Sequence, residues 1–375
     1  MCAMLAVVAT AVDQWMSHWP DFRLSLLLDV PASRPIAGYI RQLDPSFTFS
    51  VPGESYDGVY YWAMAVDPLA RGTAHNLIDL SGYRYGHPFL GWMASLLSLG
   101  NAQWLPEVFW FLSLATMAAA AWFASRLANQ MGGSPWIGLV VAASPGLVFS
   151  ATSALTEPLQ VALVLAALLV WMRHRLPRPV LLAAILVATC LTKEQLVLLP
   201  CALALEFGID WLRHRGRLDW RALPVLAVGP LALLAWRAYL RTVMTVEQMD
   251  YPEANNIGAP FSQWRLLLDY ATMLRNPDDP GAQIGGTAPT LIVATGVVLV
   301  LGAVVGLGRL DALGFLVTFL TGLMTCLGWR TLMFPHESLR TPCVALTLAL
   351  VSLLVGTGRG SSSDASEHGH GPLIT

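Results

Sequence analysis

The chain has 375 residues, of which 55% are hydrophobic and only 12% are charged, and its formal net charge at pH 7 is −2. Soluble domains usually carry about 25% charged residues, and here the apolar residues form long blocks. This composition excludes an ordinary soluble protein and favours a chain that crosses a lipid bilayer several times. The slightly negative net charge also gives no electrostatic basis for binding nucleic acid.

The apolar blocks, taken in chain order, predict about ten membrane-spanning helices. They cover residues 3–19, 105–124, 136–153, 159–172, 180–191, 196–209, 223–240, 291–307, 312–327 and 343–355. Asp13 and Gln14 interrupt the first block, which lacks the basic start and cleavage site of a signal peptide. Several blocks are shorter than the roughly 20 residues that span a bilayer upright, so flanking Trp, Pro and Arg residues must complete them.

Arginines between the blocks predict the orientation of the chain. They fall in alternate short loops, at Arg126, then Arg173, Arg175 and Arg178, then Arg213, Arg215, Arg217 and Arg221, then Arg309, then Arg359. Cytoplasmic loops collect Arg and Lys, so these loops are predicted to lie inside. Both termini are then cytoplasmic, which requires an even number of spans and agrees with about ten.

The predicted organisation is a polytopic membrane domain over residues 1–355 and a disordered cytoplasmic tail over residues 356–375. The tail is rich in Ser, Gly and His. The outer side receives a large first loop at about residues 20–104, a fourth loop at about 241–289, and three short links. Of the 22 lysines and arginines only Lys193 is a lysine, a bias typical of GC-rich bacterial genomes. We therefore expect the inner (plasma) membrane of a bacterium. The five cysteines show no CxxC spacing and are expected to be buried, inert thiols.

Two motifs in the first loop carry polar and aromatic side chains. The first runs Tyr56-Asp57-Gly58, followed by Tyr60-Tyr61 and Asp67-Pro68. The second runs Tyr83-Arg84-Tyr85-Gly86-His87-Pro88 and leads into an interfacial helix predicted over residues 89–99. Glycine beside Asp57 permits a turn, and the aromatic residues suit the membrane interface. Taken alone, Asp57 is more typical of a simple turn, and Arg84 of a solvated cation near lipid headgroups.

Three short links, predicted on the same side as Asp57, carry further charges. They hold Glu157, then Lys193 and Glu194, then His336, Glu337 and Arg340. Charges so close to hydrocarbon usually face a cavity or pair with each other. Glu157 could instead stabilise a helix N-terminus, and Lys193 and Glu194 could pair with each other. Together these groups suit an anionic, lipid-tethered substrate that carries hydroxyls, because Arg and Lys bind phosphate and a carboxylate can act as general base.

With these motifs the sequence resembles the C-type glycosyltransferase superfamily (GT-C), which are polytopic membrane enzymes that use polyprenyl-phosphate sugars. The residues that carry the resemblance are Tyr56-Asp57-Gly58, Tyr60-Tyr61, Asp67-Pro68, Tyr83-Arg84-Tyr85 with Pro88, Thr192-Lys193-Glu194 and His336-Glu337-Ser338-Leu339-Arg340. Many members have two adjacent acidic residues in the first loop, whereas here Asp57 is preceded by Glu54 three positions earlier.

The resemblance implies a GT-C-like all-α membrane bundle and an inverting glycosyltransferase with Asp57 as catalytic base. It implies that Lys193, Arg84 and Arg340 hold the donor phosphate. Other substrate-binding residues are expected at Glu54, Tyr56, Tyr60, Tyr85, His87, Glu157, Glu194, His336 and Glu337. Enzymes with monophosphate donors generally need no metal, so no cofactor is expected. The partners would be a polyprenyl-phosphate sugar, membrane lipids, and a glycan, glycolipid or protein acceptor.

Two other functions stay open at this point. A transporter or flippase for a lipid-linked sugar predicts paired repeats and polar residues at mid-membrane depth, and the sequence shows no repeat. A non-catalytic membrane scaffold would use the first and fourth loops to bind a partner. The sequence lacks the common metalloprotease, hydrolase and Walker motifs, which argues against those enzyme classes.

Overall fold

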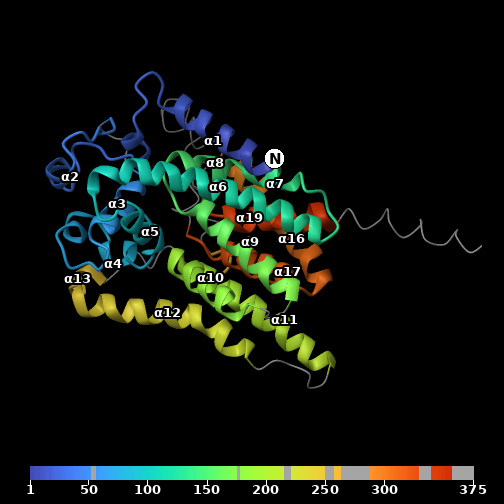
Figure 1. Cartoon of the computed structure of the whole chain (residues 1–375). Coiled ribbons are helices and arrows are strands. Elements are labelled where there is room, and N and C mark those ends of the chain that lie inside the picture. Colours follow the sequence, from blue (N-terminus) through green and yellow to red (C-terminus); the bar gives the residue numbers. More distant parts are fainter. Residues whose placement is uncertain are drawn as a thin grey trace, which may run out of the picture.

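The computed structural model describes residues 1–51, 56–174, 178–214, 221–249, 257–262, 288–328 and 339–356. Every named element in these ranges is a helix, and the only sheet-like pairings within them are isolated bridges from Pro31 to Ser50 and from Ile257 to Leu327. The all-helical architecture predicted from the apolar blocks is therefore confirmed for the described part of the chain (Figure 1).

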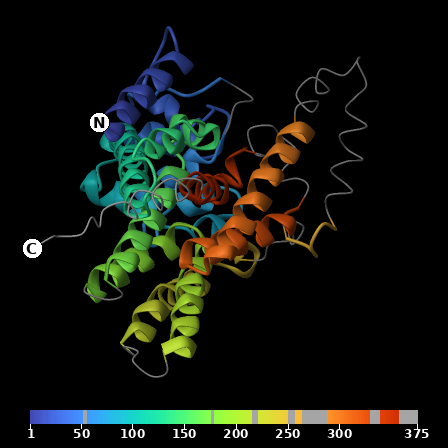
Figure 2. The ribbon, with the colours of Figure 1, turned by 90° about the vertical axis from the view of Figure 1, so that its right-hand side faces the viewer.

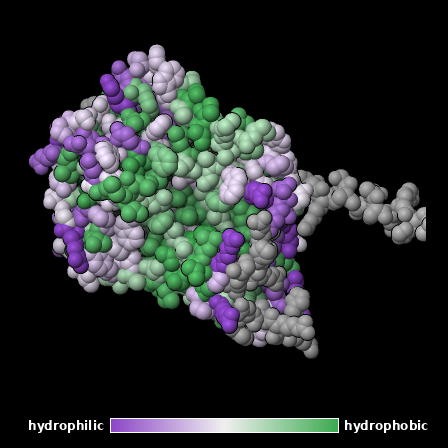
Figure 3. Space-filling model, in the orientation of Figure 1, coloured by the Kyte–Doolittle hydropathy of each residue, from purple (hydrophilic) through white to green (hydrophobic). Residues whose placement is uncertain are grey.

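Three helical segments are long and apolar enough to cross a membrane, namely Ala102–Gln130, Glu194–Arg213 and Ala222–Val243. Six shorter apolar helices accompany them, at Cys2–Ser17, Glu157–Met172, Pro179–Thr192, Val293–Arg309, Ala312–Thr325 and Cys343–Gly356. The space-filling view shows apolar surface over the middle of the molecule and more hydrophilic residues toward both ends (Figure 3). These features support the membrane character that the composition predicts.

The long helices pack as a chain of neighbours. Helix α1 (Cys2–Ser17) lies on α6 (Leu105–Gln130), α6 on α9 (Glu157–His174), α9 on α10 (Pro179–Thr192), and α10 on α12 (Ala222–Val243). A side chain at Gly229 of α12 would meet the carbonyl oxygen of Leu186 at 2.7 Å. Glycine therefore permits the close contact between α10 and α12, as small residues commonly do between membrane helices.

The C-terminal helices form a second group beside this row. Helix α11 (Leu198–His214) packs on α17 (Ala312–Thr325), and α16 (Ala288–Arg309) packs on both α17 and α19 (Cys343–Gly356). In the turned view, α16 in orange crosses close to α19 in red (Figure 2). Helix α19 also contacts α9 and α6, so the end of the chain is joined to the first group.

One predicted span differs from the observed structure. Residues 136–153 do not form one helix but two short ones, α7 (Ile137–Ala142) and α8 (Pro145–Thr152). The break falls at Ser144, whose backbone is extended with φ −61° and ψ 124°. Proline has no amide hydrogen and disfavours helical geometry in the preceding residue, so Pro145 ends the first helix and begins the second.

The first loop folds into a set of short helices at one end of the bundle (Figure 1, blue). These are η1 (Leu24–Leu28), α2 (Ala37–Leu43), α3 (Gly58–Val66), η2 (Ala74–Leu77), α4 (Ser81–Arg84) and α5 (Phe89–Leu97). Helix α5, predicted as an interfacial helix, packs on α3 and leaves Leu96 and Leu97 exposed. The loop thus has a core of its own and is not an extended connection.

Four helix ends meet at this first-loop core. One buried apolar cluster joins Trp62 and other loop residues to Leu105 of α6, Leu159 of α9, Leu191 of α10 and Leu240 of α12. The N-terminal ends of α6 and α9 and the C-terminal ends of α10 and α12 therefore share one side of the bundle. The opposite ends of α6, α10 and α12 lie beside Arg126, Arg178 and Arg221 respectively.

Candidate functional site

The carboxylate of Asp57 lies between two guanidinium groups. Arg84 Nη1 donates to Oδ1 at 3.0 Å, and Arg340 Nη1 donates to Oδ2 at 2.9 Å. Arg84 comes from α4 in the same loop, whereas Arg340 is 283 residues away and precedes α19. The tertiary fold therefore assembles this site, and each carboxylate oxygen accepts a charge-assisted hydrogen bond.

The local backbone brings Asp57 to this position. Asp57 precedes the first residue of α3, and a side chain at Gly58 would lie 2.8 Å from the carbonyl oxygen of Leu28. Glycine is required there because η1 passes so close to the start of α3. Aromatic rings then flank the cations, with the Arg84 guanidinium 3.9 Å from the ring centroid of Tyr60 and that of Arg340 4.9 Å from Tyr56. Such stacking holds the planar groups in place.

A second carboxylate belongs to the same cluster. Glu157 lies in the first turn of α9, where a negative charge interacts favourably with the helix dipole, and its Oε1 is 3.8 Å from Arg340 Nε. Within the described part of the chain, the buried atoms Glu157 Oε2 and Arg84 Nε have no hydrogen-bond partner. Unsatisfied buried polar atoms are uncommon, and here one acceptor and one donor are left for a ligand or water.

Lys193 and Glu194 form hydrogen bonds with different residues of the first loop. Lys193 has an extended backbone between α10 and η4 (Glu194–Val197), and its Nζ donates to the hydroxyl of Tyr83 at 3.0 Å. Glu194 accepts a hydrogen bond from Nε2 of His87. The charges of Lys193 and Glu194 also interact with each other, the possibility that the sequence left open. Each hydrogen bond joins the link between α10 and α11 to the first loop.

The charges of the cluster determine the protonation states. Burial opposes ionisation of Asp57, but Arg84, Arg340 and Lys193 outweigh it and lower the pKa from 3.8 to about 2. Burial lowers the pKa of His87 to about 3 against the opposing effect of Glu194. Burial also disfavours the charged forms of Arg84 and Lys193, but their acidic and phenolic neighbours raise both pKa values. At neutral pH the site thus has an ionised Asp57, charged cations and a neutral His87.

The structure brings together most of the residues predicted from the sequence. Asp57, Arg84, Arg340 and Glu157 share direct contacts, and the cluster continues through Tyr56, Tyr60, Lys193, Glu194 and His87. Tyr85 is instead fully buried, with its hydroxyl donating to the carbonyl of Ala63 at 3.1 Å. Glu54, His336 and Glu337 lie outside the described residues.

Sequence reasoning did not assign site roles to four neighbours of this cluster. Tyr83 binds Lys193, and Tyr61 lies 3.4 Å from the Thr156 hydroxyl next to Glu157. The Asp79 carboxyl interacts with both Tyr60 and Arg84, and the charge of Arg237 acts on His87. The sequence could have indicated three of these residues. Both tyrosines lie within the two first-loop motifs, and Asp79 is a lone carboxylate among apolar residues.

The arrangement is suited to bind an anion and to accept hydrogen bonds from hydroxyl groups. Three cations converge on one side of the bundle, and two carboxylates lie between them. In the described ranges no group of three or more His, Cys, Asp or Glu side chains is placed to hold a metal ion. The described part of the chain is a helical bundle whose apolar helices suggest a membrane protein, with a charged, largely buried cluster at one end.

No family model matches the chain, and no curated protein or solved structure is significantly similar to it.

Proposed function

We propose that this chain is an inverting, GT-C-type glycosyltransferase that moves a sugar from a polyprenyl-phosphate donor to an acceptor hydroxyl. The observation that carries this proposal is the convergence of Asp57, Arg84 and Arg340, with Lys193 and Glu157 beside them. A carboxylate among cations, at the end of an apolar bundle, matches the needs of a lipid phosphate that leaves while a hydroxyl attacks.

The proposed topology has about ten spans and both termini in the cytoplasm, with the first loop on the extracytoplasmic face. This topology is supported by the helix ends that meet at the first-loop core. For α6, α10 and α12 these are the ends far from Arg126, Arg178 and Arg221. Arginine collects on the cytoplasmic side, so the ends at the first-loop core are extracytoplasmic in this topology. The cluster then faces the leaflet in which a polyprenyl-linked sugar would present its phosphate.

In the proposed reaction Arg84, Arg340 and Lys193 bind the donor phosphate, and Asp57 takes the proton from the acceptor hydroxyl. The hydroxyl oxygen forms a bond to C1 of the sugar. The bond from C1 to the phosphate oxygen breaks, and polyprenyl phosphate leaves with the electron pair. Attack from the side opposite the leaving group inverts the anomeric centre. Positioning and charge stabilisation supply most of the acceleration.

The two arginines also control the basicity of Asp57. With both in place its pKa is about 2, which makes the carboxylate a weak base. A bound phosphate attracts the same guanidinium groups, so donor binding weakens their hold on Asp57 and raises its pKa. The donor therefore has two effects in this proposal, since it supplies the sugar and strengthens the base.

The test uses membranes that contain the chain, supplied with polyprenyl-phosphate donors carrying labelled mannose, arabinose, galactose or glucose. Release of polyprenyl phosphate is measured, because this product does not depend on knowing the acceptor. We expect Asp57→Asn to abolish release, and the control Asp21→Asn, at an exposed position in the same loop, to retain it. Full turnover by Asp57→Asn would refute the role of the carboxylate. Movement of intact donor across the bilayer without release would favour a flippase.

A further inference from the structure

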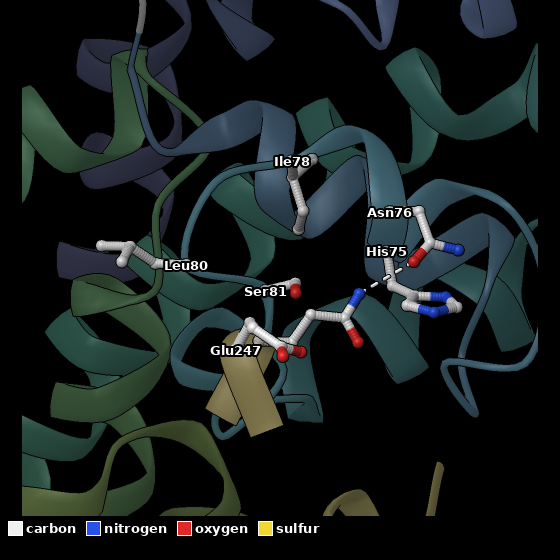
Figure 4. A pocket seen from close by; sticks show the side chains of 7 residues that line it. His75, Asn76, Ile78, Leu80, Ser81 and Glu247 are labelled. Carbon is white, nitrogen blue, oxygen red and sulfur yellow. Dashed lines mark hydrogen bonds between the residues drawn. The ribbon is translucent and has the colours of Figure 1, made fainter. Parts of the chain in front are cut away.

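A separate pocket lies between the first loop and the short helix α13 (Val246–Met249) (Figure 4). Its volume is about 230 Å³, and it is lined by His75, Asn76, Ile78, Leu80, Ser81, Glu247 and Gln248. Pockets for drug-sized ligands measure roughly 300–1,000 Å³, so this one suits a smaller molecule such as a single sugar ring. None of these lining residues was among the candidates that the sequence indicated.

Two segments far apart in the sequence form the pocket, and a side-chain hydrogen bond joins them. Gln248 Nε2 donates to Asn76 Oδ1 at 2.8 Å, the bond drawn as a dashed line in Figure 4. Gln248 also closes a capping box, because its Oε1 accepts from the Thr245 amide at 2.9 Å and its own amide donates to the Thr245 hydroxyl at 3.3 Å. The capping box orders the start of α13, and the bond from Gln248 to Asn76 joins this helix to the first loop.

The imidazole of His75 forms a hydrogen bond with the Asp67 carboxylate. His75 Nδ1 lies 2.8 Å from Asp67 Oδ2, and Asp67 Oδ1 accepts from the backbone amides of Arg71 at 2.9 Å and Gly72 at 2.8 Å. The Asp67 carboxylate accepts a hydrogen bond from Nδ1–H and so fixes the orientation of the ring. Both side chains are buried, so this pair is a built feature of the pocket wall.

The pocket and the charged cluster share one wall, residues 78–81. Ile78, Leu80 and Ser81 line the pocket, whereas the intervening Asp79 carboxyl interacts with Tyr60 and Arg84 of the cluster. Leu80 has a left-handed backbone with φ 49°, which is costly for a residue with a branched side chain. This strained turn lies between the two sites, where an acceptor and a donor would have to be held side by side.

We propose that this pocket binds the acceptor, as a neutral sugar ring. The inference rests on the proposed function, which it deepens by naming the acceptor class and its site. The lining offers amide, hydroxyl, imidazole and carboxylate groups that match sugar hydroxyls, and Ile78 and Leu80 offer an apolar face. Its described lining contains no Lys or Arg, so phosphate belongs to the cluster behind Asp79 and not here.

The first experiment measures binding and needs no turnover. The purified full chain in nanodiscs is titrated with methyl mannopyranoside, methyl galactopyranoside, methyl glucopyranoside and methyl arabinofuranoside, and binding is followed by ligand-observed NMR. We expect at least one glycoside to bind, and Asn76→Ala or Glu247→Gln to raise its Kd about tenfold, as the loss of one or two hydrogen bonds predicts. The control Gln42→Ala, at an exposed position in α2, should bind as the parent chain does. Failure of all four glycosides to bind, or equal binding by the pocket variants, would overturn the proposal.

The second experiment separates this inference from the proposed function. Donor hydrolysis to water reports the charged cluster alone, whereas transfer to the glycoside that binds reports the pocket as well. We expect Asn76→Ala to raise the KM for the glycoside about tenfold while donor hydrolysis stays unchanged. Equal loss of hydrolysis and transfer would overturn the acceptor site but leave the transferase intact. Absence of donor cleavage by the parent chain, with glycoside binding retained, would instead refute the transferase.

Discussion

Replacing Arg340 by glutamine tests whether the two arginines set the basicity of Asp57. Glutamine has a shorter side chain with an amide that can still donate hydrogen bonds, but it removes one of the two guanidinium charges that face the carboxylate. The pKa of Asp57 is about 2, below its ordinary value of 3.8. That difference corresponds to about 2 kcal/mol of preferential stabilisation of the ionised form.

The expected shift follows from the geometry. A cation within about 4–6 Å lowers a carboxyl pKa by roughly 1–3 units, and Arg84 remains in the variant. Because burial by itself raises the Asp57 pKa, losing Arg340 should move it from about 2 to about 3–5. A base must be unprotonated to act, so activity should be lost as the pH falls through this value. The acid limb of kcat/KM, which reports the free enzyme, should therefore move upward.

The assay is the release of polyprenyl phosphate by the reconstituted chain between about pH 3.5 and pH 8. We expect the parent chain to stay nearly constant down to the acid end, and Arg340→Gln to lose activity toward that end, by half at the pH that equals its raised Asp57 pKa. Size-exclusion chromatography at each pH checks that both remain folded. Arg23→Gln, an exposed cation of the same loop, is the matched control. Identical acid limbs for the parent chain and Arg340→Gln would refute the reasoning.

Three further predictions use other parts of the structure. Lys193→Met should lower kcat/KM for the donor about 10- to 100-fold, the effect of losing a charge-assisted contact, and an unchanged rate of phosphate release would exclude the residue from donor binding. Gly58→Ala should destabilise the chain by about 1–3 kcal/mol because its methyl group meets the η1 backbone at 2.8 Å, whereas Gly38→Ala, with open space around it, should not; melting temperatures in detergent compare them. In a cysteine-free chain, membrane-impermeant maleimide should label Ser33→Cys in intact cells but Asn129→Cys only after permeabilisation, and the reverse pattern would invert the proposed topology.

The sequence predicted the helical class well, because long apolar blocks have few alternatives in lipid. It failed at residues 136–153, where average hydropathy concealed the effect of Pro145 on the backbone of Ser144. Whether a proline ends a helix depends on a single residue, whereas block hydropathy depends on many. The length and continuity of a membrane-spanning helix are thus less predictable from the sequence than the presence of apolar helices.

The candidate site was predictable as a set of residues but not as a set of contacts. Short links between spans made Lys193, Glu157 and Arg340 conspicuous, because charges are rare beside hydrocarbon. The contact between Asp57 and Arg340 joins positions 283 residues apart, and no local pattern encodes it. The pocket beside α13 escaped prediction because His75, Asn76 and Gln248 are ordinary polar residues of the predicted loops. Their significance comes only from the packing of α13 on the first loop.

The two arginine hydrogen bonds to Asp57 affect the order in which donor and acceptor bind in the proposed reaction. Without donor, both carboxylate oxygens accept from guanidinium groups and the base is weak. An acceptor that binds first therefore meets a carboxylate with little tendency to take its proton. Once a phosphate draws Arg84 and Arg340 toward itself, Asp57 gains basicity at the same moment that a leaving group is present. Deprotonation is thereby tied to the presence of donor, and the arginines that bind the phosphate are the same groups that make this link.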